Sequence, residues 1–225
     1  MKAGELFVGI MSGTSLDAVD AVVCHFTPVD ADTDRDRLGL TMLASHSKPL
    51  PAELRQQLLA ITDSDSNAAA RSLGLAELAR LEATLAELYA TATGELLCAA
   101  NLQPGDIAAI GCHGQTVMHL PPPQRPAATL QLNDPSRLAV LTGIAVAADF
   151  RRADIALGGQ GAPLVPAFHH ALFGSRGRRA IANIGGIANL TLLDGDQCSG
   201  FDSGPGNALM DGWSQRPRGP PFDRD

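Results

Sequence analysis

Residues 6–26, LFVGIMSGTSLDAVDAVVCHF, contain two apolar runs separated by a turn of small polar residues. The first run, Leu6–Met11, leads into Ser-Gly-Thr-Ser and predicts a short buried strand that ends in a turn. The second run, Ala18–Phe26, is rich in valine and predicts another strand. A third apolar segment, Leu38–Ser45, follows a polar loop. Three strands joined by short links indicate an antiparallel meander.

The sequence pattern changes after this meander. Pro51–Thr62 begins with proline and spaces its apolar residues as a helix does, and Ala68–Ala100 carries a leucine stripe that predicts one or two amphipathic helices. Two further apolar runs, Ile107–Gly111 and Ile144–Asp149, predict strands that follow helical crossovers and therefore pair in parallel. This part of the chain predicts an α/β fold with a mixed five-stranded sheet.

The second half is rich in glycine and repeats the strand–turn–strand pattern of the first. Arg179–Ile184 and Leu190–Leu193 predict two strands of a hairpin around the sequence NIGGIAN. Two copies of one pattern suggest two related domains, which we place at residues 1–154 and 155–225. The tail Gln215–Asp225 has no apolar periodicity, so we expect the second domain to be incomplete.

Composition excludes several classes of protein. The 225 residues carry a net charge of −7, which argues against the basic surface of a nucleic-acid binder. The chain shows neither a signal peptide nor an apolar run long enough for a membrane span, so we expect a cytoplasmic protein. Its cysteines are widely spaced, and we expect free buried thiols, with metal binding or disulfides as the alternatives. They are Cys24, Cys98, Cys112 and Cys198.

The turn MSGTSLDAVD at 11–20 is the first candidate for chemistry. A Gly/Ser/Thr turn between strands exposes backbone N–H groups and hydroxyls that can cradle phosphate oxygens, and a neighbouring Asp could hold Mg²⁺. An ordinary hairpin is the alternative. The Walker pattern is absent.

Two more polar clusters follow predicted strands. GCHGQT at 111–116 lies at the carboxyl end of a strand, where ligands gather in sheets with parallel strands. His113 is either a structural histidine or a partner of sugar hydroxyls. Asp149–Arg152 precedes the glycine-rich segment 158–163. Arg151 and Arg152 either form structural ion pairs or clamp a phosphate or sugar oxygen.

The last two candidates lie in the second half. Asn183–Asn189 is either a second phosphate turn or a plain Gly-Gly hairpin. Asp202 precedes a glycine-rich turn, and Pro205–Trp213 predicts a helix after it. A carboxylate near a helix N-terminus is either a general base or a helix cap.

Taken in order, the motifs MSGTSLDAVD, GCHGQT, DFR, ALGGQGAPLVPAFH, NIGGIAN and FDSGPGNALMD closely resemble those of the anhydro-N-acetylmuramic acid kinases. The resemblance extends to FDRD at the end of the chain. It implies an actin/hexokinase/Hsp70-like fold, in which two domains with ribonuclease-H-like cores close on a cleft. It also implies use of ATP and Mg²⁺ to open 1,6-anhydro-N-acetylmuramic acid with water and phosphorylate O6, in peptidoglycan recycling. The implied partners are the sugar and ATP, and a homodimer is left open.

The resemblance also assigns site residues. Asp202 corresponds to the catalytic base, and no direct Mg²⁺ ligand is assigned. Two turns are assigned to the ATP phosphates: Gly13, Thr14, Ser15, Leu16, Asp17, Ala18, Val19 and Asp20 in the first, with Asn183, Gly185 and Gly186 in the second. The sugar side is assigned to His113, Gln115, Thr116 and Arg151.

The chain departs from the family pattern in three ways. Ala18 stands where Gly is frequent, Ala153 stands where a third Arg is common, and family members continue well past residue 225. We therefore expect little or no activity from this chain alone. A non-catalytic fragment or pseudo-kinase with residual sugar or nucleotide binding is the first alternative. An Hsp70- or actin-like ATPase with a protein partner is the second.

Overall fold

The computed structural model describes residues 5–28, 38–62, 74–174 and 177–207, together with Leu209, Met210 and Trp213. The chain divides into two compact units. Unit 1 comprises residues 1–27 and 40–159, and unit 2 comprises 28–39 and 160–225. Within the described ranges, no helix is both long and apolar enough to cross a membrane. The boundary that we expect between two domains, at residues 154/155, stays a prediction.

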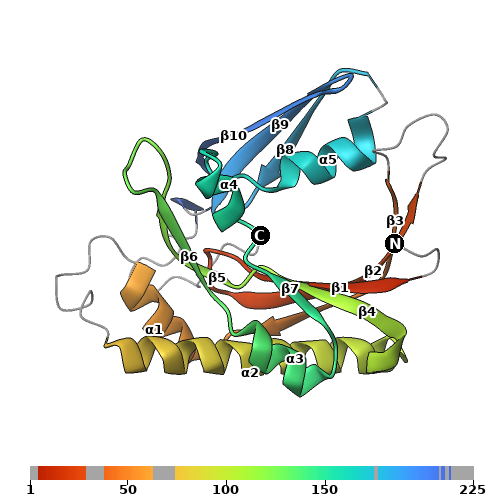
Figure 1. Ribbon diagram of the computed structural model, residues 1–225, viewed down its shortest axis with the longest axis vertical. Coiled ribbons are helices and arrows are strands. Elements are labelled where there is room, and N and C mark those ends of the chain that lie inside the picture. The colour runs from red at the N-terminus through yellow and green to blue at the C-terminus, as the bar shows by residue number, and fades with distance from the viewer. Residues whose placement is uncertain are drawn as a thin grey trace. The chain divides into compact units, whose positions relative to one another are not determined.

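Unit 1 is built on a mixed five-stranded sheet in the order β3-β2-β1-β4-β7 (Figure 1). β1 pairs antiparallel with β2 and parallel with β4, and β4 pairs parallel with β7. The predicted meander and two crossover strands are therefore confirmed, and the order is the ribonuclease-H-like one. The strands are β1 (Leu6–Ser12), β2 (Ala18–Pro28), β3 (Leu38–Pro49), β4 (Ile107–Cys112) and β7 (Val146–Ala148).

Three helices lie on one face of this sheet: α1 (Ala52–Thr62), α2 (Leu75–Ala99) and α3 (Pro135–Thr142) (Figure 1). α2 buries residues at helical spacing, and these pack with apolar side chains of β1, β2 and β4 into one core. The leucine stripe of the sequence is thus the core face of one long helix. Residues 68–73 of the predicted helical region lie outside the described residues.

A two-stranded hairpin in unit 1 was not predicted. β5 (Gln115–Leu120) pairs antiparallel with β6 (Ala128–Leu132). It begins directly after the GCHG segment, so it extends that segment into a paired strand. The short elements η2 (Pro104–Asp106) and α4 (Arg152–Ala156) complete unit 1.

Unit 2 contains a three-stranded antiparallel sheet in the order β10-β9-β8. The strands are β8 (Arg179–Ile184), β9 (Ile187–Asp194) and β10 (Gln197–Pro205), and α5 (Val165–Phe173) packs against β9 and β10. The predicted hairpin is confirmed. The helix predicted from Pro205 is wrong at its start, because Pro205 ends β10. Leu209, Met210 and Trp213 are helical.

The cysteines differ from expectation in one respect. All four are free thiols, but only Cys24 and Cys112 are buried, whereas Cys98 and Cys198 are exposed. Burial raises the pKa of the Cys112 thiol to about 11. Cys112 is therefore an inert thiol at neutral pH.

Candidate functional site

Leu16 anchors the turn between β1 and β2 to the core of unit 1. This residue has φ +56°, a left-handed conformation that is unusual for leucine. Its side chain is 1% exposed and lies in the unit 1 core. Its backbone N–H donates to the Gly13 carbonyl at 3.2 Å, and its carbonyl accepts from Nε of Arg55 on α1 at 3.1 Å. The turn is therefore rigid before any ligand binds.

Polar atoms of the same turn face outward. Thr14, Asp17 and Asp20 are exposed, and Ser15 is half-buried. Leu16 and Val19 are buried in the core, so of these two predicted phosphate residues only the backbone can reach a ligand. Buried apolar residues thus alternate with accessible polar ones in this segment.

The segment that follows β4 begins beside this turn, because β1 and β4 are parallel neighbours and their carboxyl ends lie together. The His113 backbone N–H donates to the Ile10 carbonyl at 3.0 Å. Gly114 has φ +76°, and a Cβ there would lie 2.6 Å from the Leu132 carbonyl oxygen. Only glycine fits this position, which explains the glycine after His113 in physical terms.

His113 and Arg151, both predicted on the sugar side, are brought into direct contact. Nε of Arg151 donates to Nε2 of His113 at 2.9 Å, and Nδ1 of His113 lies 2.7 Å from the Gly114 carbonyl oxygen. These two bonds together require a neutral imidazole with its proton on Nδ1. Burial lowers the His113 pKa, the Gly114 carbonyl opposes this, and the Arg151 charge lowers it further. The imidazole therefore stays neutral at neutral pH and orients the guanidinium.

Gln115 and Thr116, the other two predicted sugar residues, line a pocket of about 310 Å³ with Thr14 of the first turn and Thr62 of α1. Gln115 is 1% exposed, and its Nε2 donates to the Thr116 carbonyl at 3.3 Å. Its Oε1 is buried and has no hydrogen-bond partner among the described residues. A buried acceptor without a donor suits a ligand hydroxyl or a bound water.

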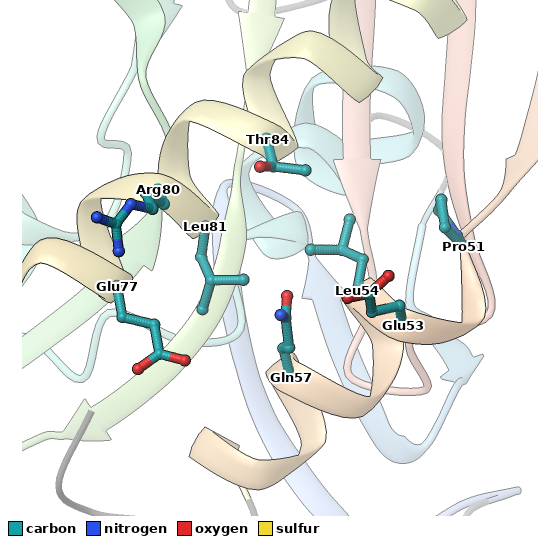
Figure 2. Close-up of a pocket in the computed structure, with 8 residues that line it drawn as sticks. All are labelled: Pro51, Glu53, Leu54, Gln57, Glu77, Arg80, Leu81 and Thr84. Atoms are coloured by element: carbon teal, nitrogen blue, oxygen red, sulfur yellow. The ribbon is translucent and has the colours of Figure 1, made fainter. Parts of the chain in front are cut away.

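A second pocket, of about 490 Å³, lies between α1 and α2 (Figure 2). Leu54 and Leu81 point into it from the two helices, and polar side chains surround them. None of the predicted site residues lines it. Its lining residues are Pro51, Glu53, Leu54, Gln57, Glu77, Arg80, Leu81 and Thr84.

In unit 2, pairing aligns three polar residues across the sheet. Asn183 of β8 lies opposite Asn189 of β9, which lies opposite Asp202 of β10. Directly paired residues share one face of a sheet, so the three form a polar row. Asn189 was not predicted as a site residue, and its Oδ1 is buried without a partner among the described residues. Only the strand register reveals it.

The polar row lies on the face that α5 covers. Thr191, two residues beyond Asn189 on the same face of β9, accepts or donates a hydrogen bond with Nδ1 of His169 on α5 at 2.9 Å. Gly200, two residues before Asp202, lies against Pro166 in the first turn of α5. Asp202 itself is exposed on that face. The carboxylate is therefore accessible beside the beginning of α5.

We expected Asp202 on a turn before a helix, but it lies within strand β10. The register shifts between Asp202 and Gly204, which makes a β-bulge. The bulged residue, Ser203, donates from Oγ to the Ala188 carbonyl at 3.1 Å. The glycine-rich sequence around Asp202 suggested a turn. Pairing with β9 makes this segment a strand that ends in a bulge.

The end of β10 closes over the Gly185-Gly186 turn. The N–H groups of Gly206 and Asn207 donate to the carbonyls of Gly186 and Gly185, both at 2.9 Å. A Cβ on Gly206 would collide with the Gly185 carbonyl oxygen. The two glycine motifs of unit 2 therefore form one folded cluster next to the polar row.

These observations first define a class: an α/β protein with a ribonuclease-H-like sheet, whose polar turns lie at the ends of paired strands. The family model for anhydro-N-acetylmuramic acid kinase matches residues 5–225, and the chain belongs to this family.

Similar curated proteins come from Bordetella pertussis, Bordetella parapertussis and Bordetella bronchiseptica. Each is an anhydro-N-acetylmuramic acid kinase, 51% identical over 223 residues, which is 99% of this chain and 54% of the relative. The chain thus spans about half the length of these relatives.

Two solved structures show more distant likenesses. A ROK hexokinase from Thermus thermophilus is 16% identical with a TM-score of 0.34, covering 86% of this chain and 48% of that one. A reductive activator for a corrinoid, iron-sulfur protein is 13% identical with a TM-score of 0.44, covering 91% and 32%. Neither is close enough to add to the argument.

Proposed function

We propose that this chain carries the phosphate turn, the sugar-binding residues and the catalytic carboxylate of an ATP-dependent kinase acting on 1,6-anhydro-N-acetylmuramic acid. The reaction opens the anhydro bond with water and phosphorylates O6, giving N-acetylmuramic acid 6-phosphate for peptidoglycan recycling in the cytoplasm. Family membership over residues 5–225 is the observation that carries this proposal. We also propose that residues 1–154 and 155–225 form two separate domains.

Asp202 is the proposed general base. Its carboxylate accepts a proton from the water that attacks the anomeric carbon, while the bond from that carbon to O6 breaks and O6 takes the phosphoryl group. Its accessible position in the polar row supports this role. Asn183 stays proposed for the ATP phosphates with Gly185 and Gly186, and Asn189 lies between Asn183 and Asp202 in the row. Orientation of the reacting groups contributes much of the rate in phosphoryl transfer.

The residues of the first turn fit a nucleotide. Gly13, Thr14 and Ser15 offer backbone and hydroxyl groups to phosphate oxygens, and Asp17 and Asp20 are exposed carboxylates. Mg·ATP supplies the phosphoryl group and neutralises its charge. Among the described residues no cluster of His, Cys, Asp and Glu side chains forms a metal site. Mg²⁺ would therefore be held largely by phosphates and water, as is usual for this ion.

The pocket beside the first turn fits the sugar. Oε1 of Gln115 needs a donor, which a sugar hydroxyl or amide N–H provides. The neutral His113 holds the Arg151 guanidinium, which can donate to sugar or carboxylate oxygens. N-acetylmuramic acid carries a carboxylate, so an oriented arginine suits this substrate class.

A coupled ADP-release assay tests the proposal. The purified chain is given Mg·ATP with and without 1,6-anhydro-N-acetylmuramic acid. Sugar-dependent release of ADP is expected from a version extended to the relatives' length, and little or none is expected from this chain alone. Release without sugar would favour a protein-partnered ATPase instead.

A non-catalytic fragment is the second candidate, because the chain spans only 54% of its relatives' length. In that case the chain shows no turnover, but a version extended to the relatives' length does. Isothermal titration with ATP or the anhydrosugar would then measure the residual binding.

A further inference from the structure

One side of α2 makes hydrogen bonds to two residues that adjoin the proposed ligand-binding segments of unit 1: Ser12 before the first turn, and Asn133 beside the His113 segment. We propose that α2 is the platform that fixes the phosphate turn and the His113 segment relative to each other, with Tyr89 and Glu82 as positioning residues. This inference deepens the proposed function and rests on it. Neither residue needs to touch a ligand, since each acts through a partner at the base of one segment.

Tyr89 holds the phosphate turn. Its hydroxyl is hydrogen bonded to Oγ of Ser12 at 2.9 Å, and both side chains are buried. Ser12 is the last residue of β1 and directly precedes Gly13. Burial is the main cause that raises the Tyr89 pKa, so the phenol stays protonated. Tyr89 is the only tyrosine of the chain, and its hydroxyl is bonded to the residue just before the turn.

Glu82 holds the other segment through Asn133. The Asn133 backbone N–H donates to Oε1 of Glu82 at 3.2 Å, and its Nδ2 donates to the Cys112 carbonyl at 3.1 Å. Cys112 directly precedes His113, and the Asn133 side chain also lies against the position where Gly114 lacks a Cβ. Glu82 therefore fixes the residue that clamps the His113 segment from both sides.

Helix geometry links the two anchors. Glu82 and Tyr89 are about two turns apart on one side of α2, which places them about 10 Å apart along the axis. Between them, Leu85 and Ala86 are fully buried and fix α2 against the sheet. The two segments are already joined by β1–β4 pairing and by the His113 N–H to Ile10 carbonyl bond, and the two anchors on the stiff helix add a second constraint on their separation. Reactions that depend on near-attack geometry lose rate when such a distance drifts.

Buried polar groups also form hydrogen bonds merely to avoid being unsatisfied. A structural role and a positioning role for these hydrogen bonds differ in which part of unit 1 a mutation loosens. A merely structural bond, when removed, loosens unit 1 as a whole. A positioning bond loosens its own segment and leaves the other unchanged.

Hydrogen–deuterium exchange of the chain separates these outcomes. Tyr89→Phe removes only the hydroxyl, and we expect exchange at residues 12–17 to rise about threefold or more, with residues 112–116 unchanged. Glu82→Ala should give the opposite pattern. Glu82→Gln keeps an acceptor oxygen and should restore the wild-type pattern.

Thr93→Val is the matched control. Thr93 is a buried hydroxyl on the same helix, and its Oγ1 donates within α2 to the Tyr89 carbonyl at 2.8 Å. Its removal should leave both segments as in the wild type. Equal loosening of both segments by Tyr89→Phe, or no rescue by Glu82→Gln, would overturn the proposal.

A kinetic arm uses Mg·ATP and 1,6-anhydro-N-acetylmuramic acid. Tyr89→Phe should raise KM for ATP about threefold to tenfold with a smaller change in KM for the sugar, and Glu82→Ala should do the reverse. Equal changes in both KM values would overturn the proposal. If the wild-type chain shows no turnover, the proposed function fails for this chain, and the exchange comparison alone decides the role of α2.

Discussion

Both units contain a strand–turn–strand element, but the two elements differ in how much of their apolar surface is buried. In unit 1 the β1–β2 hairpin is covered by α2, and Leu16 of its turn lies in the core. In unit 2 the β8–β9 hairpin carries α5 on one face, while Ile184, Leu192 and Phe201 on the opposite face are 68%, 42% and 46% exposed. One pattern in the sequence therefore produces one hairpin whose turn carries a buried core residue and another whose turn is flanked by the exposed Ile184 and Ile187.

This difference shows that a turn motif needs cover to become rigid. The first turn is fixed by a buried leucine and by a hydrogen bond from Arg55 on α1. The second turn is fixed by strand β10 folding over it. Ligand affinity in unit 1 should follow core packing, whereas in unit 2 it should follow strand pairing.

The largest expected effect concerns the carboxylate of unit 2. In a sample with sugar-dependent ADP release, Asp202→Asn should lower kcat by about 10²–10⁴-fold, because the amide cannot accept the proton of the attacking water. ATP affinity should change little. Asp194→Asn at the far end of β9 is the matched control, because the Asp194 carboxylate forms a surface ion pair with Arg178. Near-normal turnover by Asp202→Asn would remove unit 2 from the chemistry.

Core truncation should separate the two sheets. Leu85→Ala in α2 should lower the free energy of unfolding by about 2–5 kcal/mol, because Leu85 is fully buried. Leu192→Ala at an exposed position of β9 should cost under about 1 kcal/mol. Urea unfolding followed by circular dichroism measures both. Similar costs at the two positions would mean that the face carrying Leu192 is covered in solution.

Gly114→Ala should destabilise unit 1 by about 2 kcal/mol or more. The substitution adds left-handed strain, about 1–2 kcal/mol, to a clash with the Leu132 carbonyl. Gly143→Ala is the control: it has φ +70° but open space around its Cβ, so only the strain remains. The difference between the two unfolding free energies isolates the clash, and a zero difference would show that the His113 segment yields to a side chain.

The smallest effect concerns pH. The pKa of His113 is lowered in the fold, so protonation favours the unfolded state. Its contribution to stability is complete above the unfolded value of about 6.5 and is lost as pH falls from there toward the folded pKa. An NMR titration should give a His113 midpoint below 6.5, and His113→Gln should flatten the stability profile between pH 7 and 5. A midpoint above 6.5 would contradict the neutral tautomer.

Local sequence was enough for the main sheet and the turns, because apolar runs and glycine positions are local signals. The β5–β6 hairpin was missed because Gln115–Leu120 mixes polar and apolar residues without clean alternation and prolines follow it. β10 was missed because a Ser/Gly-rich segment has low strand propensity and becomes a strand only by pairing with β9.

The candidate site was predicted residue by residue but not as an arrangement. The contact between His113 and Arg151 joins segments far apart in the sequence. The row of Asn183, Asn189 and Asp202 depends on strand register, which long-range pairing determines. The unpartnered acceptor on Gln115 likewise becomes visible only once burial is known.

Leu16 belongs to both the core and the turn between β1 and β2. Melting of the unit 1 core and loss of the turn are therefore one thermodynamic event. By linkage, any molecule that binds the turn raises the melting temperature of unit 1 in proportion to the logarithm of its concentration above Kd. Heat alone is thus a probe for ligands of this chain, even in a sample that performs no chemistry.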